Sequence, residues 1–189
     1  MSDVLETLYH HVSVREYTDQ KVDETVLNQI LKAACSGSTM GNMQLFSIIV
    51  TEDDEMKRKM APFHFNQPMA TQAPLILTFC ADFRRFNRYC EFRDAETEAY
   101  SNLQSYHWAV TDALIAAQNA CVAAESLGLG FCWLGTITYN ADKFHRSAGT
   151  SPPCGAGGLH YDGLSESETR SYTETSGGGD GASRNLSRL

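Results

Sequence analysis

Small, hydroxyl and amide side chains gather between residues 36 and 44, where the sequence is Ser-Gly-Ser-Thr-Met-Gly-Asn-Met-Gln. Gly37 and Gly41 let a backbone approach a ligand closely, and Asn42 and Gln44 each carry a hydrogen-bond donor and an acceptor. Such a segment can bind a polar ligand through backbone and side-chain groups together. The alternative is an ordinary turn after a helix, which uses the same residue types.

A second group of polar residues stands near the N-terminus, where Ser13 and Arg15 flank Val14. The arginine side chain carries a permanent charge and a planar set of N–H donors, which suits a phosphate or another anion. The alternative is a surface ion pair of Arg15 with Glu16 or Asp19, which follow it closely. The residues alone leave both interpretations open.

The loop at 36–44 joins two elements with clear patterns. Residues 24–35 carry apolar side chains at the spacing of one helix face, and Asp23 before them is a suitable N-cap. Residues 45–51 are almost continuously apolar and predict a buried strand. The polar loop is therefore expected at the junction of a helix and a strand.

The same patterns extend over most of the chain. Apolar runs predict three strands, at 45–51, 74–81 and 130–135. Helical spacing predicts six helices, at 2–12, 24–35, 53–61, 83–93, 103–127 and 140–144. Strands that are apolar on both faces need cover on both sides, so we predict an α/β (α+β) fold with a central sheet flanked by helices.

The longest predicted helix is apolar but contains polar residues at intervals. They are His107, Asp112, Gln118, Asn119 and Glu125. Their number argues against a membrane span and predicts a buried central helix. At its end, Gly128-Leu129-Gly130 is expected to stop the helix before the third strand. In that strand, Trp133 is expected to lie in the core rather than to stack on a ligand.

Composition places the chain among soluble globular proteins. Its 189 residues suffice for one substantial core, and its formal net charge of -8 argues against nucleic acid or an anionic membrane as the main partner. The first residues lack the basic and apolar regions of a signal peptide. Six cysteines without metal-site spacing predict buried thiols in a reducing compartment, so a cytoplasmic protein is expected: Cys35, Cys80, Cys90, Cys121, Cys132 and Cys154.

The chain changes character near residue 144. Residues 145–189 are dominated by Gly, Ser, Thr and Arg and show no apolar periodicity, so they predict a disordered tail or a flexible linker. We accordingly predict one domain at 1–144 and a separate low-complexity segment at 145–189.

A third hypothesis for the tail is a single-base shift in the coding DNA near Phe144. With a free choice of synonymous codons, the neighbouring frame can encode a strand-like run of Val, Ile and Pro followed by Gly-Tyr-Pro. Such a strand is what the α/β pattern of residues 2–144 is missing at this point of the chain. Resequencing the gene tests the hypothesis, and an unshifted frame would refute it.

Three segments together make residues 5–144 resemble the nitroreductase family of FMN-dependent oxidoreductases. The segment from His11 to Arg15 is similar to the family's Arg-x-Ser-x-Arg/Lys, and that from Ser38 to Gln44 to its Ser-x-x-Asn-x-Gln loop. Gly128 to Thr136 is similar to its Gly-Leu-Gly and short strand after an alanine-rich helix. The family's C-terminal strand and arm have no counterpart in residues 145–189 as written.

The resemblance implies a mixed sheet in a homodimer that holds FMN at the interface. It also implies passage of hydride from NADPH or NADH through the flavin to a nitroaromatic, quinone or similar small acceptor, by a ping-pong mechanism. No side chain need act as acid or base, because the flavin carries the chemistry. The alternative is a non-catalytic or defective flavin-binding product that lacks the family's C-terminal strand and arm.

The resemblance also assigns the cofactor-binding residues. Arg15 would supply positive charge to the flavin or its phosphate, where a cation favours the reduced anionic form and raises the reduction potential. His11 stands where the family usually has Arg, so phosphate binding is expected to be weaker and pH-dependent. The remaining implied contacts are Ser13, Ser38, Thr39, Met40, Asn42, Gln44, Asn66, Leu134, Gly135 and Thr136. No metal ligand is expected.

Overall fold

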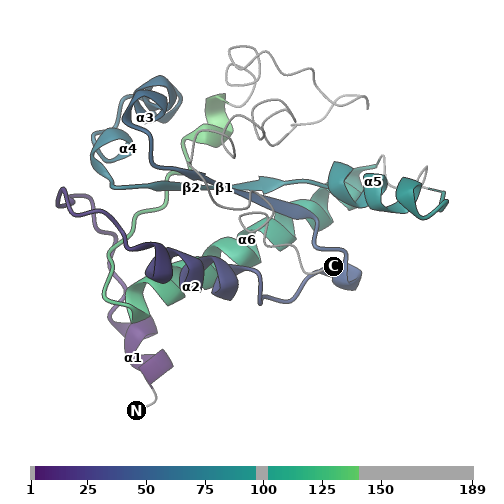
Figure 1. The fold of residues 1–189 in the computed structure, drawn as a ribbon, viewed down its shortest axis with the longest axis horizontal. Helices are drawn as coiled ribbons and strands as arrows, with labels where there is room; N and C mark the ends of the chain where they lie inside the picture. The colour runs from purple at the N-terminus through teal and green to yellow at the C-terminus, as the bar shows by residue number, and fades with distance from the viewer. Residues whose placement is uncertain (1–2, 97–101, 141–189) are drawn as a thin grey trace. The chain divides into compact units, whose positions relative to one another are not determined.

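The computed structural model describes residues 3–96 and 102–140 (Figure 1). Two strands, β1 (Phe46–Thr51) and β2 (Ile76–Ala81), pair in a two-stranded sheet. The α-helices are α1 (Asp3–Tyr9), α2 (Glu24–Ala34), α3 (Asp54–Met60), α4 (Met69–Gln72), α5 (Arg84–Phe92) and α6 (Leu103–Ser126). Short 3₁₀ turns, η1 (Met40–Asn42) and η2 (Ala61–His64), precede β1 and follow α3. The predicted strands at 45–51 and 74–81 and the predicted helices at 2–12, 24–35, 53–61, 83–93 and 103–127 are confirmed to within a few residues at each end, and α4 is an additional short helix.

The described residues fall into two compact units. Unit 1 comprises residues 3–37, 50–78 and 116–140, and unit 2 comprises 38–49, 79–96 and 102–115. The division passes through β1, β2 and α6. The predicted boundary at residue 144, residues 141–144 of the helix predicted at 140–144 and the predicted tail at 145–189 lie outside the described residues.

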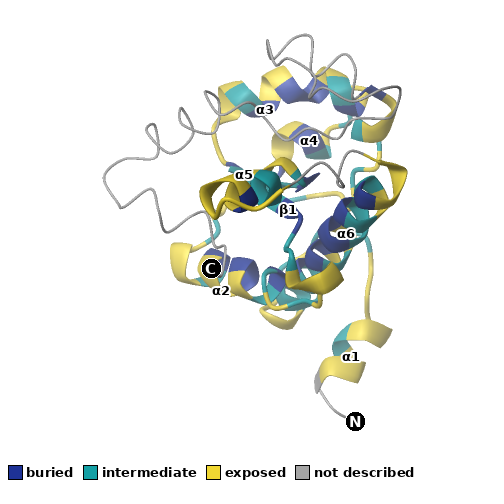
Figure 2. Ribbon diagram, turned by 90° about the vertical axis from the view of Figure 1, so that its right-hand side faces the viewer, coloured by how far each residue is buried: buried dark blue, intermediate teal, exposed yellow. Residues whose placement is uncertain are grey.

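In unit 1, α2 buries one apolar face and α6 buries small side chains. Asp23 caps α2 as predicted, because its Oδ1 accepts the N–H of Thr25 at 2.8 Å. The Nδ2 of Asn119 donates to the carbonyl of Ala33 at 3.3 Å, which ties α6 to the end of α2. Figure 2 shows the buried stripes of both helices. The buried residues are Leu27, Ile30, Leu31 and Ala34 of α2, and Ala116, Ala117, Ala120 and Ala124 of α6.

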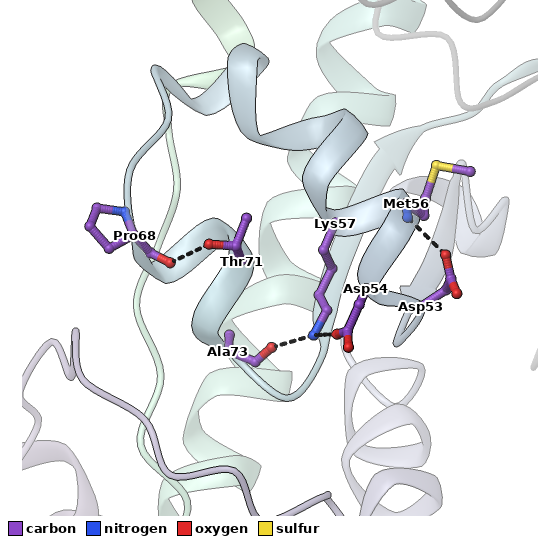
Figure 3. A network of polar contacts seen from close by, with 7 residues as sticks. All are labelled: Asp53, Asp54, Met56, Lys57, Pro68, Thr71 and Ala73. Atoms are coloured by element: carbon purple, nitrogen blue, oxygen red, sulfur yellow. Dashed lines mark hydrogen bonds and ion pairs between the residues drawn. The ribbon is translucent and has the colours of Figure 1, made fainter.

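A buried lysine joins α3 to α4 within the same unit (Figure 3). Lys57 is only 4% exposed, and its Nζ donates to the carbonyl of Ala73 at 2.9 Å and pairs with Asp54 at 2.8 Å. Ala73 is the C-cap of α4, so the ammonium satisfies a helix-end carbonyl. Asp53 caps α3 by accepting the N–H of Met56 at 2.8 Å.

Replacing this lysine is expected to destabilise the protein. Lys57→Met keeps the apolar stem but leaves the buried Ala73 carbonyl unpaired, which costs about 1–3 kcal/mol and lowers Tm by about 2–12 °C. Calorimetry measures the loss. The control is Lys59→Met, which removes an exposed pair with Glu55 on the same helix and should change the stability by less than about 0.5 kcal/mol. Equal losses in the two variants would contradict the assignment.

Unit 2 has its own apolar cluster. Leu45 and Ala109 are fully buried and meet Ala81 at the end of β2. Phe83 and Phe86, at the start of α5, pack on this cluster together with Met43, Trp108 and Val110. Further along α5, Tyr89 and Phe92 are exposed. The aromatic side chains of this helix therefore lie partly in the core and partly on the surface.

The prediction of a third strand at 130–135 is wrong. Residue Phe131 makes only an isolated parallel bridge with Ser13, and the residues after it lie in loop and turn. Trp133, expected in the core, is 46% exposed. The apolar composition of this segment had predicted a strand, but a strand requires a continuous neighbour with which to exchange hydrogen bonds. Among the described residues Phe131 has such a neighbour only at Ser13.

Two expectations about composition can be compared with the described residues. No helix in that part of the chain is long and apolar enough to cross a membrane. Of the cysteines there, Cys80 and Cys90 are buried, while Cys35, Cys121 and Cys132 are partly buried. Burial raises the pKa of the Cys121 thiol to about 12, which keeps it protonated and unreactive.

Candidate functional site

The predicted cofactor-binding residues are divided between the two units. Those in unit 2 belong to the loop before β1: Ser38, Thr39, Met40, Asn42 and Gln44. Those in unit 1 come from three separate parts of the chain: His11, Ser13, Arg15, Asn66, Leu134, Gly135 and Thr136. Within each unit, hydrogen bonds and backbone contacts connect some of these residues.

In unit 1, the parallel bridge holds the N-terminal segment against the Gly-Leu-Gly segment. Ser13 bridges Phe131, and the N–H of Val14 donates to the carbonyl of Phe131 at 2.9 Å. Gly130 makes the approach possible, because a Cβ there would lie 2.6 Å from Cγ2 and 2.8 Å from Cβ of Val14. Two of the three predicted motifs are therefore neighbours in space.

Arg15 is exposed beside this bridge. Its alternative role, an ion pair with Glu16 or Asp19, is not found among the described residues. The hydroxyl of Tyr17 donates to the carbonyl of Val14 at 2.8 Å and holds the backbone just before Arg15. The guanidinium thus extends from a fixed backbone toward solvent, which suits the binding of an anion.

His11 is partly engaged by a carboxylate of the same unit. Its Nδ1 lies 2.8 Å from Oε1 of Glu125 near the end of α6, and its ring packs 5.3 Å from that of Phe131. The Nε2 atom is the remaining ring nitrogen that can face a phosphate. Glu125 also adds negative charge nearby, so a phosphate at His11 would be held less strongly than at an arginine.

The loop that contains Asn66 is tied to the segment after Gly135. The Nδ1 of His64 lies 3.0 Å from Oγ1 of Thr136, and Nδ2 of Asn140 donates to the carbonyl of Phe63 at 2.9 Å. Asn66 has a left-handed backbone with φ of 54°. Asn66 and Thr136, predicted from distant parts of the sequence, are therefore joined through His64.

This backbone conformation is unusual for two successive residues with side chains. Phe65, with φ of 55°, and Asn66 both lie in the left-handed region, and the N–H of Asn66 donates to the carbonyl of Ala61 at 2.8 Å. Non-glycine residues in this region often mark functional sites. The exposed ring of Phe65 lies 6.4 Å from that of Tyr139, so an aromatic pair borders the site.

The buried imidazole of His64 is expected to make stability depend on pH. Burial lowers its pKa below the ordinary value of 6.5. Below about pH 6.5 the unfolded chain therefore takes up a proton before the folded protein does, and stability that is present above this pH is lost as the pH falls toward the folded-state pKa.

Urea unfolding of wild type and His64→Asn at pH 7.5, 6.5 and 5.5 measures this effect. The asparagine retains a polar atom near Oγ1 of Thr136 and does not titrate. Wild type should lose more free energy of unfolding than the variant between pH 7.5 and 5.5. Parallel losses would exclude His64 as the source.

In unit 2, the loop before β1 carries three left-handed residues. Gly41, Asn42 and Gln44 have φ of 55°, 56° and 54°. The side chains of Asn42 and Met40 are exposed, and that of Gln44 is half-buried. The N–H groups of Met40 and Leu45, at the two ends of this stretch, both donate to the carboxylate of Asp112.

Sequence reasoning missed the two residues that hold these loops. In the sequence Asp112 is one of several polar residues in an apolar helix, a pattern that does signal an internal hydrogen-bonding role. His64 had no such signal, because its hydrogen-bond partner Thr136 lies 72 positions away in the sequence. Neither residue belongs to the segments that carry the family resemblance.

Comparison with known proteins identifies the family. The sequence model of the Nitroreductase family matches residues 8–155 of this chain. The chain is 35% identical over 144 residues to an FMN reductase (NADPH) of Bacillus subtilis, and 35% identical over 143 residues to an oxygen-insensitive NADPH nitroreductase of Salmonella typhimurium. Each match covers 76% of this chain and 58% of the relative, so the chain spans less than two thirds of the length of these relatives.

Solved structures show the same relationship. A protein of Bacteroides fragilis NCTC 9343 superposes with a TM-score of 0.72 at 45% sequence identity, over 75% of this chain and 57% of that one. The structure of the nitroreductase NfrA1 from B. subtilis gives a TM-score of 0.74 at 27% identity, over 91% of this chain and 80% of that one.

Proposed function

Because the chain belongs to the nitroreductase family, we propose that it is an FMN-dependent oxidoreductase. In this proposal it passes hydride from NADPH or NADH to a nitroaromatic, quinone or similar small acceptor. The observation that carries the proposal is the exposed guanidinium of Arg15 beside the Ser13–Phe131 bridge. The names of the two curated relatives, an FMN reductase and an NADPH nitroreductase, support the same reaction class.

The donor set of unit 1 suits the phosphate end of FMN. Arg15 offers charged N–H donors, Ser13 a hydroxyl and His11 its Nε2 atom, all on the segment that the bridge fixes. Charged donors of this kind bind phosphate oxygens strongly and with defined geometry. In a chain with a net charge of -8, such a local cation also makes the site less repulsive to an anionic ligand.

The remaining predicted contacts suit the uncharged parts of a flavin. Asn42, Gln44 and Asn66 carry amides that can donate to and accept from ribityl hydroxyls or a pyrimidine edge. Gly135 has open space where a side chain would stand, since a Cβ there meets no atom within 4 Å. A planar ring can therefore approach the backbone at Leu134, Gly135 and Thr136.

When bound, FMN supplies the redox chemistry by accepting hydride from the nicotinamide and passing electrons to the second substrate. The residues of this chain bind the phosphate, orient the ring and keep a positive charge near it. Arg15 and the backbone of residues 134–136 perform these tasks in the proposal. No side chain is required to transfer a proton.

We further propose that the protein acts as a homodimer. Helix α1 and the residues after it expose several large apolar side chains. Figure 2 shows that most of the helix is exposed. Large apolar side chains exposed so close together in the sequence favour an interface. The exposed residues are Val4, Leu5, Leu8, Tyr9 and Val12. Light scattering in solution should give the mass of two chains, and a monomer that retains FMN would contradict the dimer.

The visible spectrum tests the proposed function directly. The protein is incubated with FMN, desalted, and measured before and after anaerobic addition of NADPH or NADH. A retained flavin band that bleaches with the nicotinamide supports the oxidoreductase. A band that is retained but does not bleach would favour the non-catalytic flavin-binding alternative. A colourless protein would contradict the oxidoreductase and favour a defective product that lacks the family's C-terminal strand and arm.

A further inference from the structure

One buried carboxylate holds both ends of the segment from Met40 to Leu45. Asp112 of α6 is fully buried, and its Oδ1 accepts the N–H of Met40 at 2.8 Å while its Oδ2 accepts that of Leu45 at 3.1 Å. A carboxylate offers two acceptor oxygens and no donor, so it satisfies both N–H groups at once. Hydrogen bonds to a charged acceptor are stronger than those between neutral groups.

The backbone between these two N–H groups is in a conformation that needs external support. Gly41, Asn42 and Gln44 are left-handed, and the local hydrogen bonds form one short turn. In that turn the N–H of Met43 donates to the carbonyl of Met40 at 3.0 Å. Left-handed residues with side chains persist where the surrounding structure over-determines them. Asp112 provides that support at both ends of the stretch.

Asp112 itself lies in the buried part of unit 2. Asp112 lies one turn after Ala109 on α6, and Ala109 packs in the apolar cluster with the fully buried Leu45. A dry environment strengthens the hydrogen bonds of the carboxylate and makes it costly to break them. Displacement of the segment would leave a buried charge without its partners.

We propose that Asp112 is a positioning residue that preorganises the segment from Met40 to Leu45 for the flavin. It acts through the backbone, by fixing the conformation from which the amides of Asn42 and Gln44 are presented. The inference rests on the proposed function, which assigns these two amides to FMN. A preorganised segment binds more tightly because less ordering remains to be done on binding.

The test compares Asp112→Asn with Asn119→Ala. The isosteric Asp112→Asn retains one acceptor oxygen, so one of the two N–H groups faces an NH₂ group instead. Asn119 lies on the same helix and also forms a hydrogen bond with a backbone group. Its partner is the carbonyl of Ala33, which lies outside the segment from Met40 to Leu45. The control therefore removes a comparable anchor from another part of the chain.

Two measurements distinguish the effect of Asp112 on the segment from its effect on FMN binding. Hydrogen exchange of residues 38–46 in the FMN-free protein reports the anchor, and the dissociation constant for FMN, from quenching of flavin fluorescence, reports its consequence. Asp112→Asn should speed exchange at Met40 or Leu45 at least about tenfold and weaken FMN binding about 10–100-fold. Asn119→Ala should leave FMN binding within about twofold of wild type.

Unchanged exchange in Asp112→Asn would overturn the inference, as would equal losses of FMN affinity in the two variants. If Asp112→Asn does not fold, site-resolved exchange in wild type decides, because the N–H groups of Met40 and Leu45 must be protected relative to an unfolded chain. A wild type that protects both groups but binds no FMN would contradict the proposed function and overturn the flavin role of Asp112, while the anchor would stand.

Discussion

Arg15→Ala is expected to weaken FMN binding by about 10–100-fold, because it removes charged hydrogen bonds worth about 1.5–3 kcal/mol from the phosphate. The side chain is exposed on a backbone held by the bridge of Ser13 with Phe131, so its loss should not disturb the fold. Titration of flavin fluorescence at low ionic strength measures the effect. Arg15→Lys keeps the charge without the planar fork and should fall between wild type and alanine.

The control for this prediction is Arg58→Ala on α3. It removes one positive charge from an exposed position of the same unit, outside the predicted site. Added salt should weaken FMN binding to wild type more than binding to Arg15→Ala, because screening acts on a charge that the variant lacks. Equal affinities of Arg15→Ala and Arg58→Ala would show that Arg15 contributes only to the overall charge.

Gly130→Ala is expected to cost about 1–3 kcal/mol of stability and about 2–12 °C in Tm. The new Cβ would lie 2.6 Å from Cγ2 of Val14, and the short branched side chain of valine cannot move aside without its backbone. The displacement would separate Ser13 from Phe131 and carry Arg15 with it. FMN affinity should therefore fall together with stability.

Gly135→Ala provides the matched comparison, since it adds the same methyl group where no atom lies within 4 Å. The FMN-free variant should unfold within about 0.5 kcal/mol of wild type, while its affinity for FMN should fall, because the methyl group occupies the space assigned to the ring. Calorimetry without FMN and fluorescence titration with FMN separate the two effects. A Gly130→Ala protein as stable as Gly135→Ala would show that the bridge does not depend on close approach at Gly130.

The sequence by itself determined most of the local elements. Helix α2 with its Asp23 cap, helix α6 with its end before Gly128, and strands β1 and β2 follow from the spacing of apolar side chains and from helix-end chemistry. These signals lie within a few residues of the structure that they predict. The segments that carry the family resemblance are equally local, and the family match over residues 8–155 confirms the assignment.

The tertiary structure decided which of those elements meet and what holds them. The composition of residues 130–135 predicts a strand, but pairing requires a neighbour, and within residues 3–96 and 102–140 Phe131 pairs only with Ser13. The carboxylate of Asp112 bonds to residues 67 and 72 positions away, and His64 meets Thr136 across 72 positions. Burial and partners at such separations depend on how the whole chain packs, and no local spacing of residue types encodes them.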